Sequence, residues 1–419
     1  MTVYSPFSVD TLRDRLCHVA AVTDRIGHDT SEWDVREVGD GNLNLVFIVT
    51  APKGALVVKQ ALPYVRLVGD SWPLPLKRSF FEYNALIRQA ARDPGRVPDV
   101  YYFDEAQALV IMRYLSPHVI LRKSIVAGQQ HPNLAGDMGL FLARTLFRGS
   151  NLSMAAAEAK ADLAMFADNV ALADITENLV FSDPYFAAAM NRHTPGLEPW
   201  IDRLRADRDM KVAAQAMKHA FVSKAETLVH GDLHSGSIMV TADDTQVIDP
   251  EFAIYGPFGF DIGMLLANFL LGYFAQSGHE HAPGGRADYR HWLLAVVRET
   301  WDVFAAEFTR LWRTERSGIL YQRSLFEDQG DTLASEQALQ GVVSGIWSDA
   351  MGFCGVEMHR RILGLAHVED LESIADDGRR LLAERRALAL GRHVAVNRSS
   401  ITMAGLLDVA ERIEAEDLA

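Results

Sequence analysis

The part of the sequence that most constrains both fold and chemistry is the stretch 227–261, TLVHGDLHSGSIMVTADDTQVIDPEFAIYGPFGFD. Two short runs rich in β-branched residues, 238–240 and 246–248, flank the polar tip at 242–244 and predict a β-hairpin. In an antiparallel pair, the start of one strand lies beside the end of the other. The loop that leads into this hairpin and the loop that leads out of it are therefore expected to meet at its open end.

Three carboxylates occupy these two loops: Asp232 in the segment His230-Gly231-Asp232 before the hairpin, and Asp249 and Glu251 after it. Carboxylates that crowd together repel one another unless a cation lies among them, and Mg²⁺ prefers oxygen ligands of this kind. An aspartate that acts as a base beside an acidic pair that holds a metal is an arrangement used in phosphoryl transfer. The alternative is three surface acids around a tight turn, and the HGD block favours the first interpretation.

The size and charge of the chain limit its partners. A chain of 419 residues is long enough for two lobes with a sizeable core. Its 55 acidic and 41 basic residues give a formal charge of −14, and a field of that sign repels nucleic acids and anionic membranes. We therefore expect neither as a partner, and an anionic nucleotide would need a local positive site together with a metal.

Cysteine usage and hydropathy indicate the compartment. Only Cys17 and Cys354 occur, without a CxxC pair, so we expect no disulfide framework and no zinc site, as in a reducing cytosol. The N-terminus lacks a basic flank followed by an apolar core, and the longest apolar run, 262–275, contains Asn268 and is too short to span a bilayer. The expected location is the cytoplasm.

A glycine-rich turn near the N-terminus is expected to cover phosphates. Residues 35–38 and 45–49 predict two strands joined by 39–44 (GDGNLN), and glycine lets backbone amides approach a ligand closely. The alternative is an ordinary tight turn. In a third predicted strand, 55–59, Lys59 ends an apolar run, from which it could reach nucleotide phosphates. The alternative is a solvated lysine at the end of a strand.

A helix and two more strands complete this part of the chain. The predicted helix 77–91 carries Glu82 near its first turns, where the carboxylate can pair with Lys59 and hold it in place. The alternative is a solvent-facing glutamate. Residues 97–103 and 108–112 predict strands, which gives an antiparallel sheet of about five strands with one helix.

Outside the sheet, the pattern is mostly helical. Residues 8–25 have the apolar spacing of one helix, whereas 63–75 (PYVRLVGDSWPLP) predicts a long loop that exposes Trp72. The connector 113–117 follows the last strand of the sheet. Helical patterns then dominate the rest of the chain, apart from the hairpin.

Adjacent Arg360 and Arg361 lie in a mostly apolar helical block, 348–370. Adjacent helical residues point about 100° apart, so at least one of the two arginines must face inward or along an edge. A semi-buried arginine needs an anionic partner. A bound substrate or a structural salt bridge can supply it, and both alternatives stay open on the residues alone.

The features described above follow one another as a glycine-rich turn, a strand lysine, a helix glutamate, a connector, an HGD loop and a DxE segment after a hairpin. In this order they resemble the protein-kinase-like fold of the small-molecule kinases, which include aminoglycoside and choline kinases and carry HGDLHxGN and IDxE motifs. Further blocks narrow the resemblance to the S-methyl-5-thioribose kinase family of methionine salvage. These blocks are GDGNLNLVFIV, WPLPLKRSFFE, MRYLSPHVILRK, HGDLHSGSIMV, DPEFAIYGPFGFDIG and GFCGVEMHRRILGLAHVED. They extend from residue 39 to residue 370, which is nearly the whole chain.

The resemblance implies a bilobal α+β fold, with a small lobe of five antiparallel strands plus a helix and a large, mostly helical lobe. The expected parts are a nucleotide-binding lobe at 1–112, a hinge at 113–117 and a catalytic and substrate lobe at 118–419. It also implies ATP-dependent phosphorylation of O1 of S-methyl-5-thioribose, with ATP and Mg²⁺ as cofactors and a homodimer as the assembly. An aminoglycoside, choline or another 5-substituted ribose is the alternative acceptor.

Residue roles follow from the same resemblance. Asp232 would be the catalytic carboxylate, which also contacts the sugar; Asp249 and Glu251 would hold Mg²⁺; and Asp261 would brace the catalytic loop. The residues expected to contact ATP are Gly39, Gly41, Asn42, Asn44, Lys59, Glu82, Arg113, Tyr114, Leu115, Asp249, Pro250 and Glu251. Those expected to contact the thioribose are Asp232, Trp72, Arg360 and Arg361. Kinases of this fold outside the thioribose kinase family have a metal-binding asparagine where this chain has Ser237. Whether Ser237 binds metal stays open.

Overall fold

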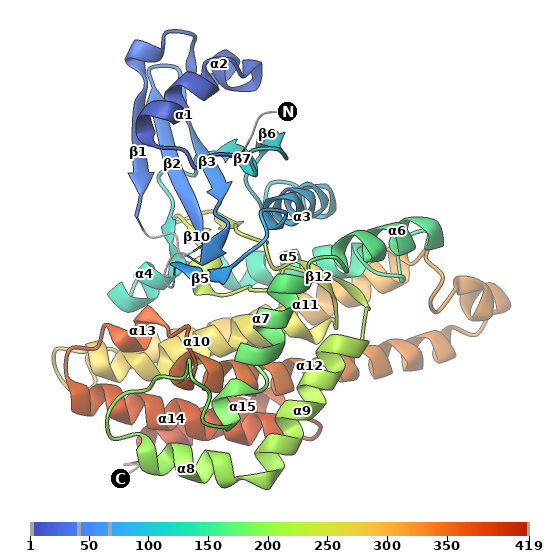
Figure 1. The fold of residues 1–419 in the computed structure, drawn as a ribbon. Helices are drawn as coiled ribbons and strands as arrows, with labels where there is room; N and C mark the ends of the chain where they lie inside the picture. Colours follow the sequence, from blue (N-terminus) through green and yellow to red (C-terminus); the bar gives the residue numbers. More distant parts are fainter. Residues whose placement is uncertain (1–3, 40–42, 66–68, 417–419) are drawn as a thin grey trace.

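The computed structural model describes residues 4–39, 43–65 and 69–416 and has two lobes (Figure 1). An antiparallel five-stranded sheet forms the centre of the smaller, N-terminal lobe, with strand order β1-β2-β3-β7-β6. This confirms the sheet predicted from the sequence. Its strands are β1 Asp34–Val38, β2 Asn44–Ala51, β3 Gly54–Ala61, β6 Val100–Asp104 and β7 Leu109–Arg113.

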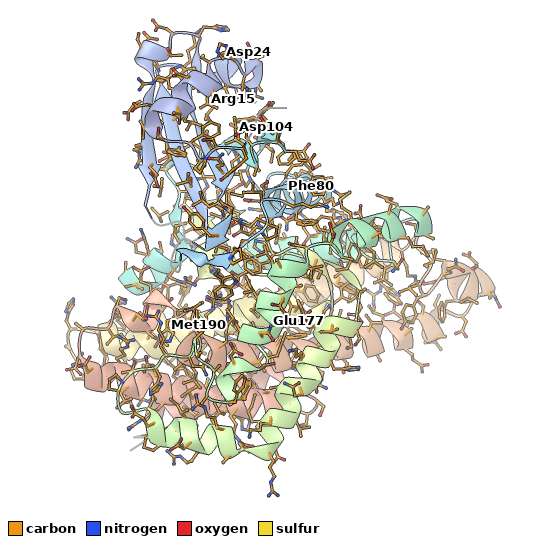
Figure 2. The ribbon with its side chains drawn as sticks, in the orientation of Figure 1. Arg15, Asp24, Phe80, Asp104, Glu177 and Met190 are labelled. Atoms are coloured by element: carbon orange, nitrogen blue, oxygen red, sulfur yellow. The ribbon has the colours of Figure 1, made fainter. Side chains whose placement is uncertain are left out.

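Helices cover both faces of this sheet. Helices α1 Val9–Leu16 and α2 Ala20–Ile26 pack with Phe47 and Val58 in one apolar cluster, and Arg15 of α1 pairs with Asp104 at the end of β6 (Figure 2). On the other face lies α3 Arg78–Arg92, whose Leu86 joins the core of the large lobe. The helix α3 therefore connects the sheet to the rest of the molecule.

Two local predictions for the small lobe were wrong. The single helix expected at 8–25 is two helices, because the backbone becomes extended at Val19 (φ −100°, ψ 105°). The bend allows Leu16 and Val22, on either side of it, to be buried in the same cluster.

The stretch 63–75, expected as a loop, contains two strands, β4 Tyr64–Val65 and β5 Gly69–Pro73, that pair with each other. Trp72 is only partly exposed, because it packs against a small apolar cluster formed by Leu74 and by Leu172 of α7 Val170–Leu179.

The larger lobe is built around α10 Gly259–His279, most of whose side chains are buried. It packs against α11 Ala287–Glu315, α12 Thr332–Leu363 and α14 Asp377–Val396, and α11 packs in turn against α5 Leu134–Arg148 (Figure 1). Within the described ranges, no helix is both long enough and apolar enough to cross a membrane. The other helices are α4 Leu121–Ala127, α6 Ala156–Phe166, α8 Glu198–Ala206, α9 Arg208–Ser223, α13 Glu369–Glu372 and α15 Met403–Ala415. Short 3₁₀ helices are η1 Thr30–Glu32, η2 Asp183–Tyr185, η3 Ser235–Ser237, η4 Arg323–Leu325 and η5 Glu327–Gln329.

Small strand pairs in the large lobe position the loops of the 227–261 stretch. The predicted hairpin is formed by β10 Ile238–Val240 and β11 Thr245–Val247, and Ile238 lies opposite Val247. The two-residue strand β8 Val119–Ile120 pairs with β10, and β9 Thr227–Val229 pairs with β12 Ile254–Gly256. This register brings the loop before β10 and the loop after β11 to the same end of the hairpin.

Two glycines let α10 and α12 pack backbone to backbone. A Cβ on Gly259 would lie 2.6 Å from the nitrogen of Ala350, and one on Gly263 would lie 2.4 Å from the oxygen of Ala350. Real Cβ atoms do not approach backbone atoms this closely, so any larger residue would push the helices apart. This contact sets the spacing between the start of α10 and the helix that carries Arg360 and Arg361.

Replacing Gly263 with alanine is therefore expected to lower the free energy of unfolding by about 1–3 kcal/mol through overpacking. Gly345→Ala on α12 is the matched control, because Gly345 is exposed and a methyl group added there would contact nothing beyond its own stretch of helix. There the added methyl should raise stability by about 0.5–1 kcal/mol through helix propensity. Urea unfolding followed by circular dichroism measures both, and a stabilised Gly263→Ala variant would contradict the packing argument.

Candidate active site

The loop His230-Gly231-Asp232 is held in place by Asp261, in the first turn of α10. The two carboxylate oxygens of Asp261 accept the backbone N–H groups of His230, at 2.6 Å, and Gly231, at 3.1 Å. Gly231 has φ +88°, and a Cβ there would lie 2.1 Å from the carbonyl oxygen of Phe252. Only glycine fits this position, so the loop is locked against the segment that follows Glu251.

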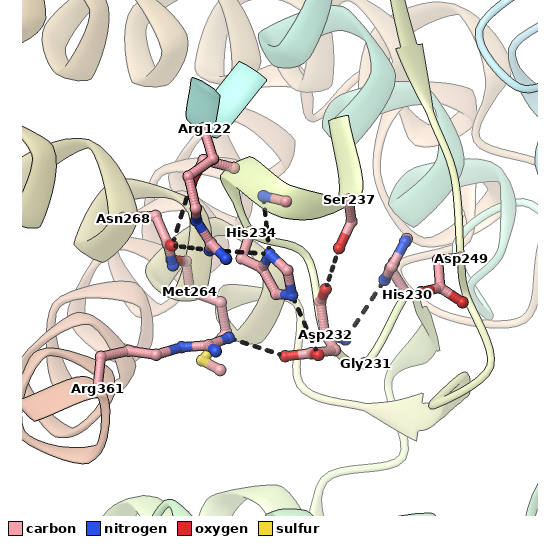
Figure 3. A network of polar contacts seen from close by, with 12 residues as sticks. Arg122, His230, Gly231, Asp232, His234, Ser237, Asp249, Met264, Asn268 and Arg361 are labelled. Carbon is pink, nitrogen blue, oxygen red and sulfur yellow. Dashed lines mark hydrogen bonds and ion pairs between the residues drawn. The ribbon is translucent and has the colours of Figure 1, made fainter. Parts of the chain in front are cut away.

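The carboxylate of Asp232 receives donors from three side chains, of which Figure 3 shows Arg361 and His234. Its Oδ1 lies 3.2 Å from Nη2 of Arg361 and 3.5 Å from Nη1 of Arg360, and its Oδ2 lies 3.3 Å from Nε2 of His234. Burial opposes its ionisation, but the contact with His234 and the charges of the two arginines outweigh burial and hold the pKa of Asp232 well below its usual range. Asp232 is therefore an ionised acceptor and a weak base.

Both arginines of the adjacent pair face the site, because one buried glutamate on α12 binds both. Glu357 precedes them by one helical turn, and its Oε1 accepts Nε of Arg361 at 2.5 Å. Its Oε2 lies 3.1 Å from Nη1 of Arg360. At least one inward arginine was expected from the sequence, but Glu357 was not identified as its partner. Its position three and four residues before the pair, on the same helical face, was the signal that could have found it.

A second group of charges surrounds Lys59, on β3. Its ammonium lies 2.9 Å from Oε1 of Glu82, on α3, and also pairs with Asp249 after the hairpin. Burial would lower the pKa of Lys59, but Asp249, Glu82 and Glu251 outweigh burial and raise it. The lysine therefore stays charged, and the structure brings it together with the glutamate that was predicted as its partner.

Glu251 is held by Asn44, at the end of the glycine-rich turn, and by Arg78, at the start of α3. Nδ2 of Asn44 donates to its Oε2 at 3.1 Å, and Nε of Arg78 lies 3.3 Å from the same oxygen. Arg78 also donates to Oδ1 of Asn44 at 3.0 Å and to the carbonyl of Leu43. Asn44 was expected to contact ATP, and in the structure its side chain is hydrogen-bonded to Glu251. Arg78 was not predicted from the sequence, because its position in the first turn of a helix resembles that of an ordinary surface arginine.

The acids around Lys59 form a donor set that suits a hard divalent cation. Oxygen atoms of Glu82, Asp249 and Glu251 all lie within 4.8 Å of one another. Burial and the charge of Asp249 raise the pKa of Glu251, which shows that the ionised carboxylates repel one another here even beside Lys59 and Arg78. Asp249 is exposed and has φ +70°, a backbone conformation uncommon outside glycine. These oxygens match the ligands that Mg²⁺ prefers.

The two groups of charges are joined through His230. Its Nε2 contacts the carbonyl of Ile248 at 2.9 Å, and its Nδ1 accepts the backbone N–H of Asp232 at 3.3 Å. Figure 3 shows its ring between Asp232 and Asp249, whose charges repel each other. Ser237 donates its hydroxyl to the carbonyl of Asp232 at 2.9 Å. Asp232 therefore lies on the same side of the fold as Asp249 and Glu251, as expected from the predicted hairpin.

Other predicted contacts lie around these groups or outside the described residues. Gly41 and Asn42 fall outside the described ranges, and Gly39 is exposed at the end of β1. In the connector, Leu115 is buried, Tyr114 is half-buried, and Nη2 of Arg113 donates to Oε1 of Gln246 at 3.2 Å. Pro250 is buried between Asp249 and Glu251. Among the described residues, the structure gives Trp72 apolar neighbours and no polar contact that would define a sugar site.

The fold and the site together define a phosphotransferase. The features that define it are a strand lysine paired with a helix glutamate, an HGD loop held by Asp261, and an acidic pair after a hairpin. The model of the phosphotransferase enzyme family matches residues 34–306, which is more than half of the chain. This range includes Lys59, Asp232 and Glu251 but ends before Arg360 and Arg361.

Curated relatives give a narrower assignment. Methylthioribose kinase 1 of Oryza sativa subsp. japonica is 44% identical over 372 residues, which cover 88% of this chain and 86% of the relative. Methylthioribose kinase of Escherichia coli is 44% identical over 397 residues, which cover 94% of each chain. That of Geobacillus kaustophilus is 42% identical over 386 residues, which cover 91% of this chain and 92% of the relative. The chain belongs to the methylthioribose kinase family.

Solved structures are more distant. That of glucosamine kinase in complex with glucosamine, ADP and inorganic phosphate aligns with a TM-score of 0.49 and 16% identity, covering 91% of this chain and 85% of that chain. That of a choline kinase from Cryptosporidium parvum aligns with a TM-score of 0.41 and 11% identity, covering 92% of this chain and 98% of that chain.

Proposed function

We propose that this chain transfers the γ-phosphoryl group of ATP to O1 of S-methyl-5-thioribose, giving S-methyl-5-thioribose 1-phosphate and ADP in methionine salvage. The observation that carries the proposal is the convergence of Arg360 and Arg361 on Asp232, beside the acids that surround Lys59. Relatives that are 42–44% identical over most of the chain are methylthioribose kinases.

In this proposal, Asp232 accepts a hydrogen bond from the anomeric hydroxyl and aligns its oxygen with the γ-phosphorus. The bond between O1 and phosphorus forms while the bond from phosphorus to the bridging oxygen of ADP breaks, and the hydroxyl proton passes to Asp232 and then to solvent. A loose transition state needs little help from a base, so a carboxylate of low pKa can act mainly by orientation.

The remaining charged residues are proposed to bind the two substrates. Lys59, held by Glu82, contacts the α- and β-phosphates, and Arg360 and Arg361 contact the sugar hydroxyls or the equatorial oxygens of the transferring group. Mg²⁺, when held by Asp249 and Glu251, supplies positive charge that neutralises the phosphates. The other proposed ATP contacts are Gly39, Gly41, Asn42, Asn44, Arg113, Tyr114, Leu115 and Pro250, and Trp72 is proposed to close over the thioribose.

The proposed organisation of the chain follows from the same interpretation. Residues 1–112 act as the nucleotide-binding lobe, 113–117 as the hinge, and 118–419 as the catalytic and substrate lobe. The chain acts in the cytoplasm as a homodimer, on a small sugar and not on nucleic acid or membrane.

A panel of acceptors tests the function. The purified chain with ATP and Mg²⁺ is assayed for ADP release with methylthioribose, ribose, choline and kanamycin, and phosphorus NMR identifies the phosphorylated oxygen. We expect turnover with methylthioribose and a phosphate on O1, because two arginines beside Asp232 disfavour a cationic acceptor. Chelation of the metal should abolish it. Turnover with choline or kanamycin but not with methylthioribose would overturn the proposal in favour of another small-molecule kinase.

A further inference from the structure

We propose that His234 is a positioning residue that Arg122 holds in one tautomer, so that its Nε2–H donates to Asp232 and orients that carboxylate. The inference rests on the proposed function for its effect on turnover, and on the contacts of His234 for its geometry. Figure 3 shows the three side chains in sequence, from Arg122 through His234 to Asp232.

The tautomer follows from the donors around Nδ1 of His234. The backbone N–H of Gly236 donates to it at 2.9 Å, and Nη2 of Arg122 lies 3.2 Å from it. An arginine is always protonated and a backbone amide always carries its hydrogen, so both are donors. An atom that faces two donors carries no hydrogen itself. The proton of the neutral ring is therefore on Nε2, which lies 3.3 Å from Oδ2 of Asp232.

The environment also keeps the ring neutral. Burial lowers the pKa of His234 to about 4, and the charges of Arg361 and Arg122 add to this against the opposing effect of Asp232. A neutral donor orients Asp232 without adding a third full positive charge beside the two arginines.

Arg122, on α4, is itself fixed from several elements. Its Nε contacts Oγ of Ser235 and Oδ2 of Asp370, each at 3.2 Å, and its Nη2 donates to Oδ1 of Asn268 at 3.2 Å. Asn268 is the polar residue within the apolar run of α10, and its Nδ2 donates to the carbonyl of Met264 at 3.0 Å, so its oxygen faces Arg122. The apolar helix α10 thus contributes an amide to this chain of contacts.

Gly236 leaves room for the ring. A Cβ there would lie 2.6 Å from Cε1 and 2.8 Å from Nδ1 of His234. His234 is also the residue at the N-cap of η3, so capping alone is the competing explanation for the same contact. Capping uses only Nδ1 of His234, whereas the positioning role also requires Nε2 to donate to Asp232.

Two amide substitutions separate the explanations. In His234→Asn, the short side chain can still cap η3 but cannot reach Asp232; in His234→Gln, the longer amide places an N–H near the position of Nε2. We expect His234→Asn to fold with an unchanged unfolding temperature and to lose roughly 10–100-fold in kcat, the effect of one hydrogen bond to a charged group. His234→Gln should stay within about fivefold of the parent, since it keeps that hydrogen bond. An active asparagine variant together with an inactive glutamine variant would overturn the proposal in favour of capping.

Nuclear magnetic resonance tests the tautomer without any turnover. With ¹⁵N-labelled histidine, the signal that disappears in His234→Gln is that of His234, and we expect an unprotonated Nδ1 and a protonated Nε2 at neutral pH. A protonated Nδ1 would overturn the proposal whichever acceptor the enzyme uses. If the tautomer is as expected but methylthioribose is not phosphorylated, the proposed function fails while the contact stands.

Discussion

Replacing Asp232 with asparagine is expected to lower kcat for methylthioribose by about 10²–10⁴-fold, the usual effect of losing a positioned catalytic carboxylate. An amide can offer one oxygen, but its NH₂ group must then face either His234 or Arg361, which are themselves donors. The variant therefore loses the negative charge, and the remaining amide oxygen is turned away from one of its two donors. Steady-state kinetics with saturating ATP measure the effect. Turnover equal to that of the parent would remove Asp232 from the chemistry.

Asp243→Asn is the control for this substitution. Asp243 is exposed at the tip of the same hairpin, and its backbone, not its carboxylate, makes the hydrogen bonds found there. Its substitution should leave kcat and the KM for ATP unchanged, because the residue lies at the opposite end of β10 from the HGD loop. A loss of similar size in this control would mean that the hairpin as a whole responds to the removal of charge.

Replacing Glu357 with leucine is expected to lower the free energy of unfolding by about 3–5 kcal/mol, because it leaves two buried arginines with Asp232 as the one carboxylate between them among the described residues. Glu357 is fully buried, and Arg360 and Arg361 are almost so. The variant should also lose turnover, since both guanidinium groups would be free to move relative to Asp232. Urea unfolding followed by tryptophan fluorescence measures the stability.

Glu336→Leu is the matched control on the same helix. Oε2 of Glu336 lies 2.7 Å from Nη2 of Arg313, but this ion pair is exposed to solvent. Its loss should cost no more than about 1 kcal/mol, as for other surface ion pairs. If the two substitutions have equal effects on stability, burial is not what makes the glutamate at position 357 important.

The ordered motifs predicted the parts of the site whose geometry comes from local structure. The start and end of a hairpin lie together in any fold that contains it, so Asp232 could be expected near Asp249 from the sequence alone. The pairing of Lys59 with Glu82 was expected from the resemblance and is present in the structure. The break at Val19 was not predicted, because it depends on packing Leu16 and Val22 into one cluster with distant strands. The paired strands in 63–75 were not predicted, because the prolines and the glycine of that stretch are typical of a loop.

The residues that could not be predicted from the sequence are those that hold the reacting groups in place. Arg78 and Arg122 are ordinary in residue type and spacing, and each has its role only because a distant segment approaches it. Arg122 is more than one hundred positions from His234, and Arg78 is still farther from Glu251. Such contacts leave no periodic pattern in the chain.

The sequence by itself determined which chemical groups the site contains and which family the chain resembles, because these depend on residue identity and on short-range order. The tertiary structure alone decided that both arginines of the pair face Asp232, and that His234 presents a donor to it. The physical reason is that these orientations are set by the close packing of α10 against α12 and by buried ion pairs, which join Arg122 of α4 to Asp370 of α13 and hold the arginine pair on α12 itself. Such constraints act only once the helices are in contact.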